Sequence, residues 1–181
     1  MNIFYLSDNP KLAAKYHNNS HVVKMVLETA QILCTAHRVL DGTEDKILKN
    51  GRFQKHWKMK DPEQELYLYK ATHINHPSVK WACESKNNYE WLYKLFASLC
   101  EEYKYRYGKT HLCETKLMTK IMNPPKNISD TPFTSPPQAM PEEFHDTDSI
   151  VAYRNYYIHG KSHLATWTKR RTPKWYKNKE I

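Results

Sequence analysis

The stretch Lys11–Leu40 most constrains the fold, because it holds 30 residues without Pro or Gly. When its second half is placed on a helix at about 100° per residue, apolar side chains cover more than half of the circumference. A helix of this kind is expected to run through the middle of a domain. Asn18, Asn19 and Ser20 favour caps and turns, so one interpretation breaks the helix there and has Ser20 cap a helix that begins at His21.

The polar residues of this stretch form one narrow stripe along the helix, because successive polar residues are separated alternately by four and three positions in the sequence. They are His17, His21, Lys24, Glu28, Gln31, Thr35 and Arg38. Two interpretations remain open. The stripe is either a solvated edge held by structural ion pairs, or the floor of a site in which Glu28 is a general acid or base, His21 is its partner, and Lys24 and Arg38 neutralise phosphate.

Composition favours one mainly helical domain over residues 1–181, with about four to five packed helices. Four Gly stand against 10 Pro, and no stretch approaches the roughly 20 apolar residues that cross a bilayer. The start MNIFYLSDNP lacks the features of a signal peptide, so we expect a cytoplasmic protein that does not enter a membrane.

Local signals place the remaining elements. We expect a short strand or extended segment at Asn2–Leu6, and a mobile loop with a short helical piece over 43–64. One helix should run from Pro77 to Tyr107 and end at Gly108, a shorter one should cover 111–122, and another Ser149–His159. Six of the ten prolines lie in 123–141, which predicts an ordered, irregular crossing loop.

The C-terminal end is strongly basic and aromatic. From His159 onward there are seven Lys or Arg and one acid, Glu180, so +6 of the net charge of +9 lies in the last 23 residues. This pattern is typical of a polyphosphate partner, most often nucleic acid, although a solubilising tail at 169–181 would show the same charge. The residues that we expect to hold a nucleic-acid backbone or to flank the site are Tyr153, Arg154, Arg170, Arg171, Trp175 and Tyr176.

The motif Thr72-His73-Ile74-Asn75-His76-Pro77 precedes a predicted helix N-terminus. His73, Asn75 and His76 would form a donor-rich loop suited to a phosphate or a base edge. Two histidines at this spacing are a weak metal signal, and we expect neither a metal nor a cofactor. Motifs of P-loop NTPases, Rossmann dehydrogenases and serine hydrolases are absent from the sequence.

The C-terminal third resembles the small phage pyrimidine-dimer DNA glycosylases of the endonuclease V type. The resemblance rests on Pro141–Phe144, on Ala152–Tyr157, and most specifically on Arg171-Thr172-Pro173-Lys174-Trp175-Tyr176-Lys177. More loosely, Leu12–Val22 is similar to that family's first helix and Trp81–Gly108 to its long middle helix. The resemblance implies an all-α fold and N-glycosyl cleavage of DNA, with an N-terminal amine as nucleophile, a glutamate on the first helix, and strand cleavage through a Schiff base.

Two positions depart from the family pattern. Residue 2 is Asn, which should leave Met1 in place, whereas the family exposes its amine by removing Met before a small residue. The family's Arg-Glu pair falls on His17-Asn18, so Glu28 is the nearest acid on the same helix. Either the chemistry has moved to Glu28 and His21, or the scaffold binds DNA without the reaction.

The leading hypothesis is a protein of this type that acts on or binds damaged or modified DNA. The alternative is a phage counter-defence protein, forming a homo-oligomer, that sequesters or cleaves a small phosphorylated signalling nucleotide in a basic, aromatic pocket. A third option is an interaction protein whose tail docks on a partner.

Overall fold

The computed structural model describes residues 1–179, and for Lys49 the backbone only. Its elements in chain order are α1 (Pro10–Tyr16), α2 (Asn19–Asp41), β1 (Thr43–Lys49), β2 (Arg52–Lys58), α3 (Pro62–Tyr67), α4 (Pro77–Glu84), α5 (Lys86–Tyr107), α6 (Leu112–Leu117), η1 (Glu142–Phe144), α7 (Ser149–Asn155), η2 (Tyr156–Gly160), η3 (Ser162–Leu164) and α8 (Lys174–Asn178). The mainly helical fold is therefore confirmed. Residues 180 and 181 of the predicted basic tail, Glu180 among them, lie outside the described residues.

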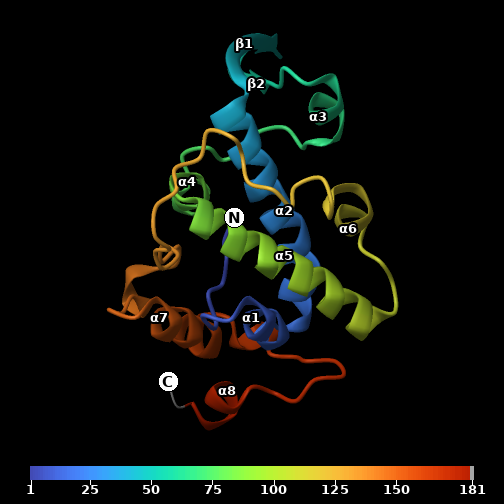
Figure 1. Ribbon diagram of the computed structural model, residues 1–181. Coiled ribbons are helices and arrows are strands. Elements are labelled where there is room, and N and C mark those ends of the chain that lie inside the picture. The colour runs from blue at the N-terminus through green and yellow to red at the C-terminus, as the bar shows by residue number, and fades with distance from the viewer. Residues whose placement is uncertain (180–181) are drawn as a thin grey trace.

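The two long helices α2 and α5 cross at the centre of the molecule (Figure 1). Most of the apolar surface of α2 is covered, with Val22, Met25, Ile32 and Leu33 all at zero exposure, whereas Val23 and Leu27 are 43% and 41% exposed. Helices α1 and α4 pack on α5 as well. The wide apolar surface of α2 thus produces the central helix that the sequence predicts.

The break before α2 is real, but its cap is Asn18 and not Ser20. The Asn18 side chain accepts a hydrogen bond from the His21 backbone N–H, and α2 begins at Asn19. Asparagine is among the best N-cap residues because its side-chain oxygen satisfies a free N–H of the first turn. This break turns the chain, so that α1 packs on α5 separately from α2.

The mobile loop predicted over 43–64 is wrong for residues 43–58, which form an antiparallel β-hairpin, whereas the short helical piece predicted there corresponds to the start of α3. Strands β1 and β2 pair from Thr43 opposite Lys58 to Lys49 opposite Arg52. The Asn50-Gly51 turn has positive φ at both residues, 51° and 73°, which matches the right-handed twist of a two-residue hairpin. In Figure 1 the hairpin stands at the end of α2, beyond the helical body.

Three further expectations need correction. The helix predicted over Pro77–Tyr107 is interrupted at Ser85, whose extended backbone caps α5 and whose hydroxyl donates to the Thr131 carbonyl. The helix predicted over 111–122 ends at Leu117, and the one predicted to reach His159 changes at Tyr156 into a π-helical turn. The predicted stop at Gly108, with φ of 67°, is confirmed.

The proline-rich segment 123–141 is irregular, as predicted, and it is fastened to the helices. The Trp81 indole donates to the Thr134 carbonyl, and the Asn88 amide donates to the Trp81 carbonyl and to the Thr134 hydroxyl. No helix among residues 1–179 combines the length and the apolar character that a membrane-spanning segment requires.

Candidate active site at the start of the chain

The first two residues are held against the middle of α2. The Asn2 backbone N–H donates to Glu28 Oε2 at 3.0 Å, and the Met1 α-amine lies 4.0 Å from the same oxygen. The Asn2 side chain donates to the Ala139 carbonyl at 2.8 Å and accepts from the backbone N–H groups of Ile3 and Phe4. The start of the chain is therefore fixed between α2 and the proline-rich segment.

Glu28 is the centre of this cluster. Its side chain is only 13% exposed and also pairs with Lys24 Nζ at 3.3 Å, one helical turn earlier. Lys24 is exposed, so the cluster opens to solvent on that side. One carboxylate thus faces two amines, an arrangement that can hold or transfer a proton beside a nucleophile.

The loop at 72–77 approaches the same cluster. His76 caps α4 by accepting from the Ser78 backbone N–H. Its pKa is lowered by burial, then by the positive charges of the N-terminal amine and His73, with Glu28 opposing. His76 therefore belongs to the surroundings of the amine, whereas His73 and Asn75 are exposed on the loop.

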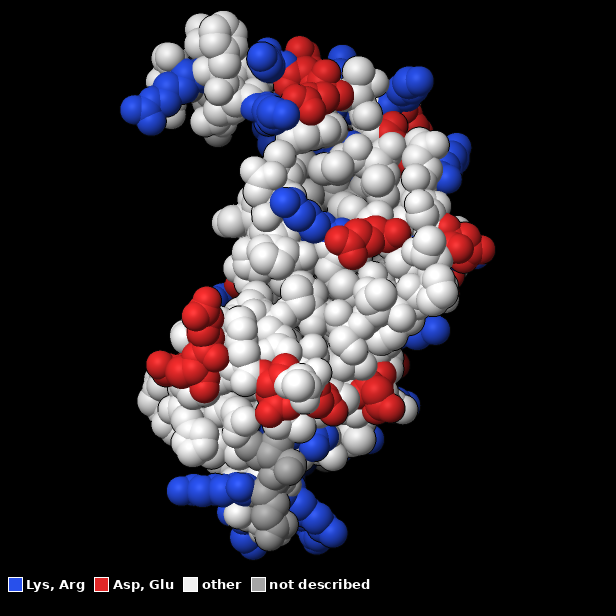
Figure 2. Space-filling view, turned by 90° about the vertical axis from the view of Figure 1, so that its left-hand side faces the viewer, with Lys and Arg blue, Asp and Glu red and all other residues white. Residues whose placement is uncertain are grey.

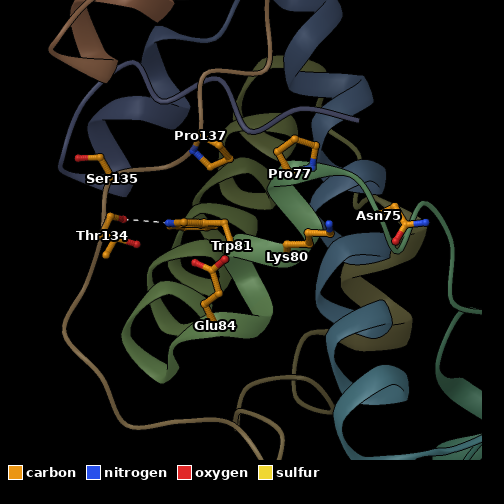
Figure 3. Close-up of a pocket in the computed structure, with 8 residues that line it drawn as sticks. All are labelled: Asn75, Pro77, Lys80, Trp81, Glu84, Thr134, Ser135 and Pro137. Carbon is orange, nitrogen blue, oxygen red and sulfur yellow. Dashed lines mark hydrogen bonds between the residues drawn. The ribbon is translucent and has the colours of Figure 1, made fainter.

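A groove of about 450 Å³ lies between α4 and the proline-rich segment (Figure 3). One side comes from α4, with Pro77, Lys80, Trp81 and Glu84, and the other from the proline-rich segment. Pro77 follows His76 directly. Pro137 is tied through the Tyr153 hydroxyl to Ala139, which binds Asn2. The groove and the amine cluster are thus connected through the loop at 72–77 and the proline-rich segment.

His17 and His21 do not reach that surface. His17 is fully buried and its Nδ1 bonds the Ala13 carbonyl. His21 is 5% exposed, stacks on Phe4 and hydrogen-bonds the Tyr157 hydroxyl. Burial lowers the pKa of His17 to about 4 and that of His21 to about 3. Both are neutral core residues, so the assignment of His21 as the partner of Glu28 is not supported by their positions.

Arg38 is a structural residue and not a phosphate ligand. Its guanidinium donates to the backbone carbonyls of Trp57, Glu65, Leu68 and Tyr69 and to the Glu65 carboxylate at 2.7 Å. These bonds occupy the donors of a side chain that is 1% exposed. Gln31, by contrast, is partly exposed on the turn after Glu28.

Most of the predicted C-terminal clamp is also turned inward. Trp175 is 8% exposed and packs on Tyr16 and Tyr157, and Tyr153 is fully buried. Arg154 donates to the Leu6 carbonyl, and Arg170 pairs with the buried Glu102 at 2.8 Å. Tyr176 is half-buried against Trp167. Arg171 alone among the six predicted residues is exposed.

Of the residues that hold the start of the chain, the sequence predicts Glu28 as part of the site but not Asn2 or Ala139. The position implied by the resemblance, Asn18, is buried in the cap of α2, whereas the carboxylate that meets the start of the chain is that of Glu28. An available signal was the resemblance itself, because a nucleophilic N-terminal amine needs an acid close to residues 1 and 2.

Comparison with known protein families decides the relationship. A family profile described as pyrimidine dimer DNA glycosylase matches residues 1–115, well over half of the chain. The chain belongs to this family.

Membership in the pyrimidine dimer DNA glycosylase family makes the chain DNA-glycosylase-like and indicates damaged DNA as its partner. The nucleotide-sequestering alternative receives no support. Neither a curated protein nor a solved structure matches the chain.

Proposed function

We propose that this protein is a DNA N-glycosylase with associated AP-lyase activity, whose nucleophile is the α-amine at the start of the chain. The observation that carries the proposal is the placement of the Met1 amine and the Asn2 N–H at 4.0 and 3.0 Å from one Glu28 oxygen. Either nitrogen could be the nucleophile. The Met1 nitrogen is the free amine when Met1 is retained, and the Asn2 nitrogen becomes the free amine when Met1 is removed.

The reaction begins at the sugar of the damaged nucleotide. The neutral amine attacks C1′, and the bond from C1′ to the base breaks with its electron pair leaving on the base nitrogen. Opening of the sugar ring, with a proton delivered to the ring oxygen, yields a Schiff base between C1′ and the amine. Loss of a C2′ proton then expels the 3′ phosphate and cuts the strand.

Glu28 would supply the proton transfers. Its carboxylate lies 4.0 Å from the Met1 amine nitrogen and is largely shielded from water, so it is placed to take the proton that the amine loses and return it to the ring oxygen. Lys24, exposed and ion-paired to the same carboxylate, would neutralise a phosphate next to the lesion. α-Amines are less basic than lysine side chains, so the chain start is the better nucleophile of the two amines near neutral pH.

Borohydride trapping tests the proposal on two duplexes, one with an abasic site and one with a cyclobutane pyrimidine dimer. We expect one covalent adduct, which peptide mass spectrometry maps to the residue that begins the chain. Glu28→Gln should lower the trapping rate by about 100-fold or more, while Glu101→Gln, on the exposed side of α5, should leave it unchanged.

Two results would overturn the proposal. One is the absence of any adduct and of strand cleavage on both duplexes, with the amine verified as unblocked. The other is an adduct that maps to Lys24 and disappears in Lys24→Arg, which would make the lysine the nucleophile.

A further inference from the structure

The β1–β2 hairpin projects from the body and has an unpartnered apolar tip. Leu48 and Phe53 are 66% and 73% exposed and lie directly opposite each other in the strand register. Side chains of a directly opposed pair lie on the same face of the hairpin. A two-stranded hairpin is marginally stable by itself in water, so exposing two large apolar side chains at its end is a cost that calls for a function.

The same face carries a like-charge pair next to the apolar tip. Lys46 lies opposite Lys55, two residues from Leu48 and Phe53 along each strand. Directly opposed like charges destabilise a sheet, and the ion pair of Lys55 with Glu44 at 2.8 Å offsets only one of the two charges. Over both strands there are five Lys or Arg against two acids. An anion placed between the lysines would remove the repulsion.

The hairpin is rigidly connected to the candidate active site. Helix α2 carries Glu28 and continues without a break to Asp41, and β1 begins at Thr43. Thirteen residues of helix place the base of the hairpin about 20 Å from Glu28 along the helix axis, which corresponds to about six base steps at roughly 3.4 Å each. Lys46 and Lys55 lie further along the strands, beyond that point in the chain. In Figure 2 the hairpin overhangs the body at the upper left, and the outline below it is hollowed.

We propose that this hairpin is a second DNA contact that grips the duplex to one side of the lesion, about six base pairs away or further. Lys46 and Lys55 hold a backbone phosphate, and Leu48 and Phe53 press as an apolar wedge into the adjacent groove. Apolar side chains flanked by cations are the usual means by which proteins enter the minor groove and bend DNA. This inference rests on the proposed function for the position of the lesion, but the contact itself requires no catalysis.

The test uses abasic-site duplexes with about four base pairs on one side of the lesion and about twelve on the other, in both orientations. Wild-type protein should bind one orientation more tightly, because the hairpin lies on one side only. The double variant Leu48→Ser, Phe53→Ser should lose roughly tenfold in affinity, equivalent to about 1.4 kcal/mol, for that orientation alone. Leu112→Ser, which removes an equally exposed leucine (61%) from α6, is the matched control.

The readouts separate this inference from the proposed function. Borohydride trapping at saturating protein should be equal in the double variant and the wild type. If wild-type protein forms no adduct but the double variant still loses the orientation-dependent affinity, the DNA contact is supported and only the proposed enzymatic activity is overturned. The DNA contact is overturned if wild type and double variant bind both orientations equally, or if the double variant converts a dimer to a monomer in sedimentation, which would assign the apolar tip to a second copy of the chain.

Discussion

At the scale of single residues, Arg38 shows how a cation on a polar stripe can be wholly structural. Its bonds join α2 to β2 and to the segment around α3. Arg38→Met should therefore destabilise the protein by about 3–5 kcal/mol, because the buried carbonyls and the Glu65 carboxylate lose their partner. Urea unfolding measures this change, with the exposed Arg52→Met as control. Equal stability of Arg38→Met and wild type would show that the guanidinium contributes nothing to folding.

Three buried histidines give the protein a defined response to acid. Burial lowers the pKa of His17 and His37 to about 4 and of His21 to about 3, against an ordinary value of 6.5. The unfolded chain therefore binds more protons below pH 6.5. The contribution of these histidines to the free energy of unfolding is fully present above pH 6.5. It falls as the pH drops toward 4, by up to about 1.4 kcal/mol per pH unit for each histidine.

Urea unfolding between pH 7 and 4.5 measures this slope. His37→Gln keeps a donor for the Tyr89 hydroxyl. It should reduce the slope of unfolding free energy against pH by the amount that one of the three histidines contributes. An unchanged slope in His37→Gln would mean that His37 takes up its proton equally in the folded and unfolded states.

At the scale of elements, the cap of α2 can be assigned by experiment. Asn18→Ala should cost about 1 kcal/mol because the first-turn N–H of His21 loses its acceptor. Ser20→Ala, at an exposed position inside the helix, should change stability by less than about 0.5 kcal/mol. Thermal unfolding of the two variants measures both values. A larger loss of stability for Ser20→Ala would show that Ser20, and not Asn18, is the N-cap residue.

The contrast between α2 and the hairpin explains what the sequence could predict. Periodicity identifies α2 because one of its sides is buried along its whole length. The hairpin is exposed on both faces over residues 43–48 and 50–55, so its strands show no alternation of apolar and polar residues, and only Asn50-Gly51 marks the turn.

The site was predictable in part for a related reason. Spacing gives the angle of a side chain around a helix, but not how deeply it is covered. Glu28 and Lys24 of the stripe remain at the surface cluster, whereas His21 is covered by Tyr157 and Arg38 by the Trp57 and Leu68 segments. These covering segments lie 19 to 136 residues away in sequence, so the spacing within the helix does not show that both ends of the stripe are buried.

At the scale of the whole molecule, charge is divided between anchoring and exposed roles. Figure 2 shows Lys and Arg at both ends of this face, mixed with Asp and Glu at the upper end, and further Asp and Glu in the lower half of the body. In the C-terminal segment Arg170 is held by Glu102, while the neighbouring Arg171 is exposed. The two arginines are adjacent in sequence, yet only the second is free to meet a phosphate.

Salt dependence of DNA binding separates these two roles. Arg171→Gln should lower the slope of log affinity against log salt by about one, since one phosphate contact is lost. Arg170→Gln should leave the slope unchanged and lower the thermal stability instead. The reverse pattern would show that the Glu102 pair opens when DNA binds.

The unbroken α2 also limits how relatives of this protein can vary in length. Each residue inserted between Glu28 and Asp41 would move the hairpin by about 1.5 Å and turn it by about 100° around the helix axis. One or two added residues would swing the hairpin away from the DNA, whereas about seven, close to two full turns, would restore its direction. Relatives that keep both the glutamate at position 28 and the hairpin should have the same helix length between them, or a length that differs by about seven residues, which is two full turns.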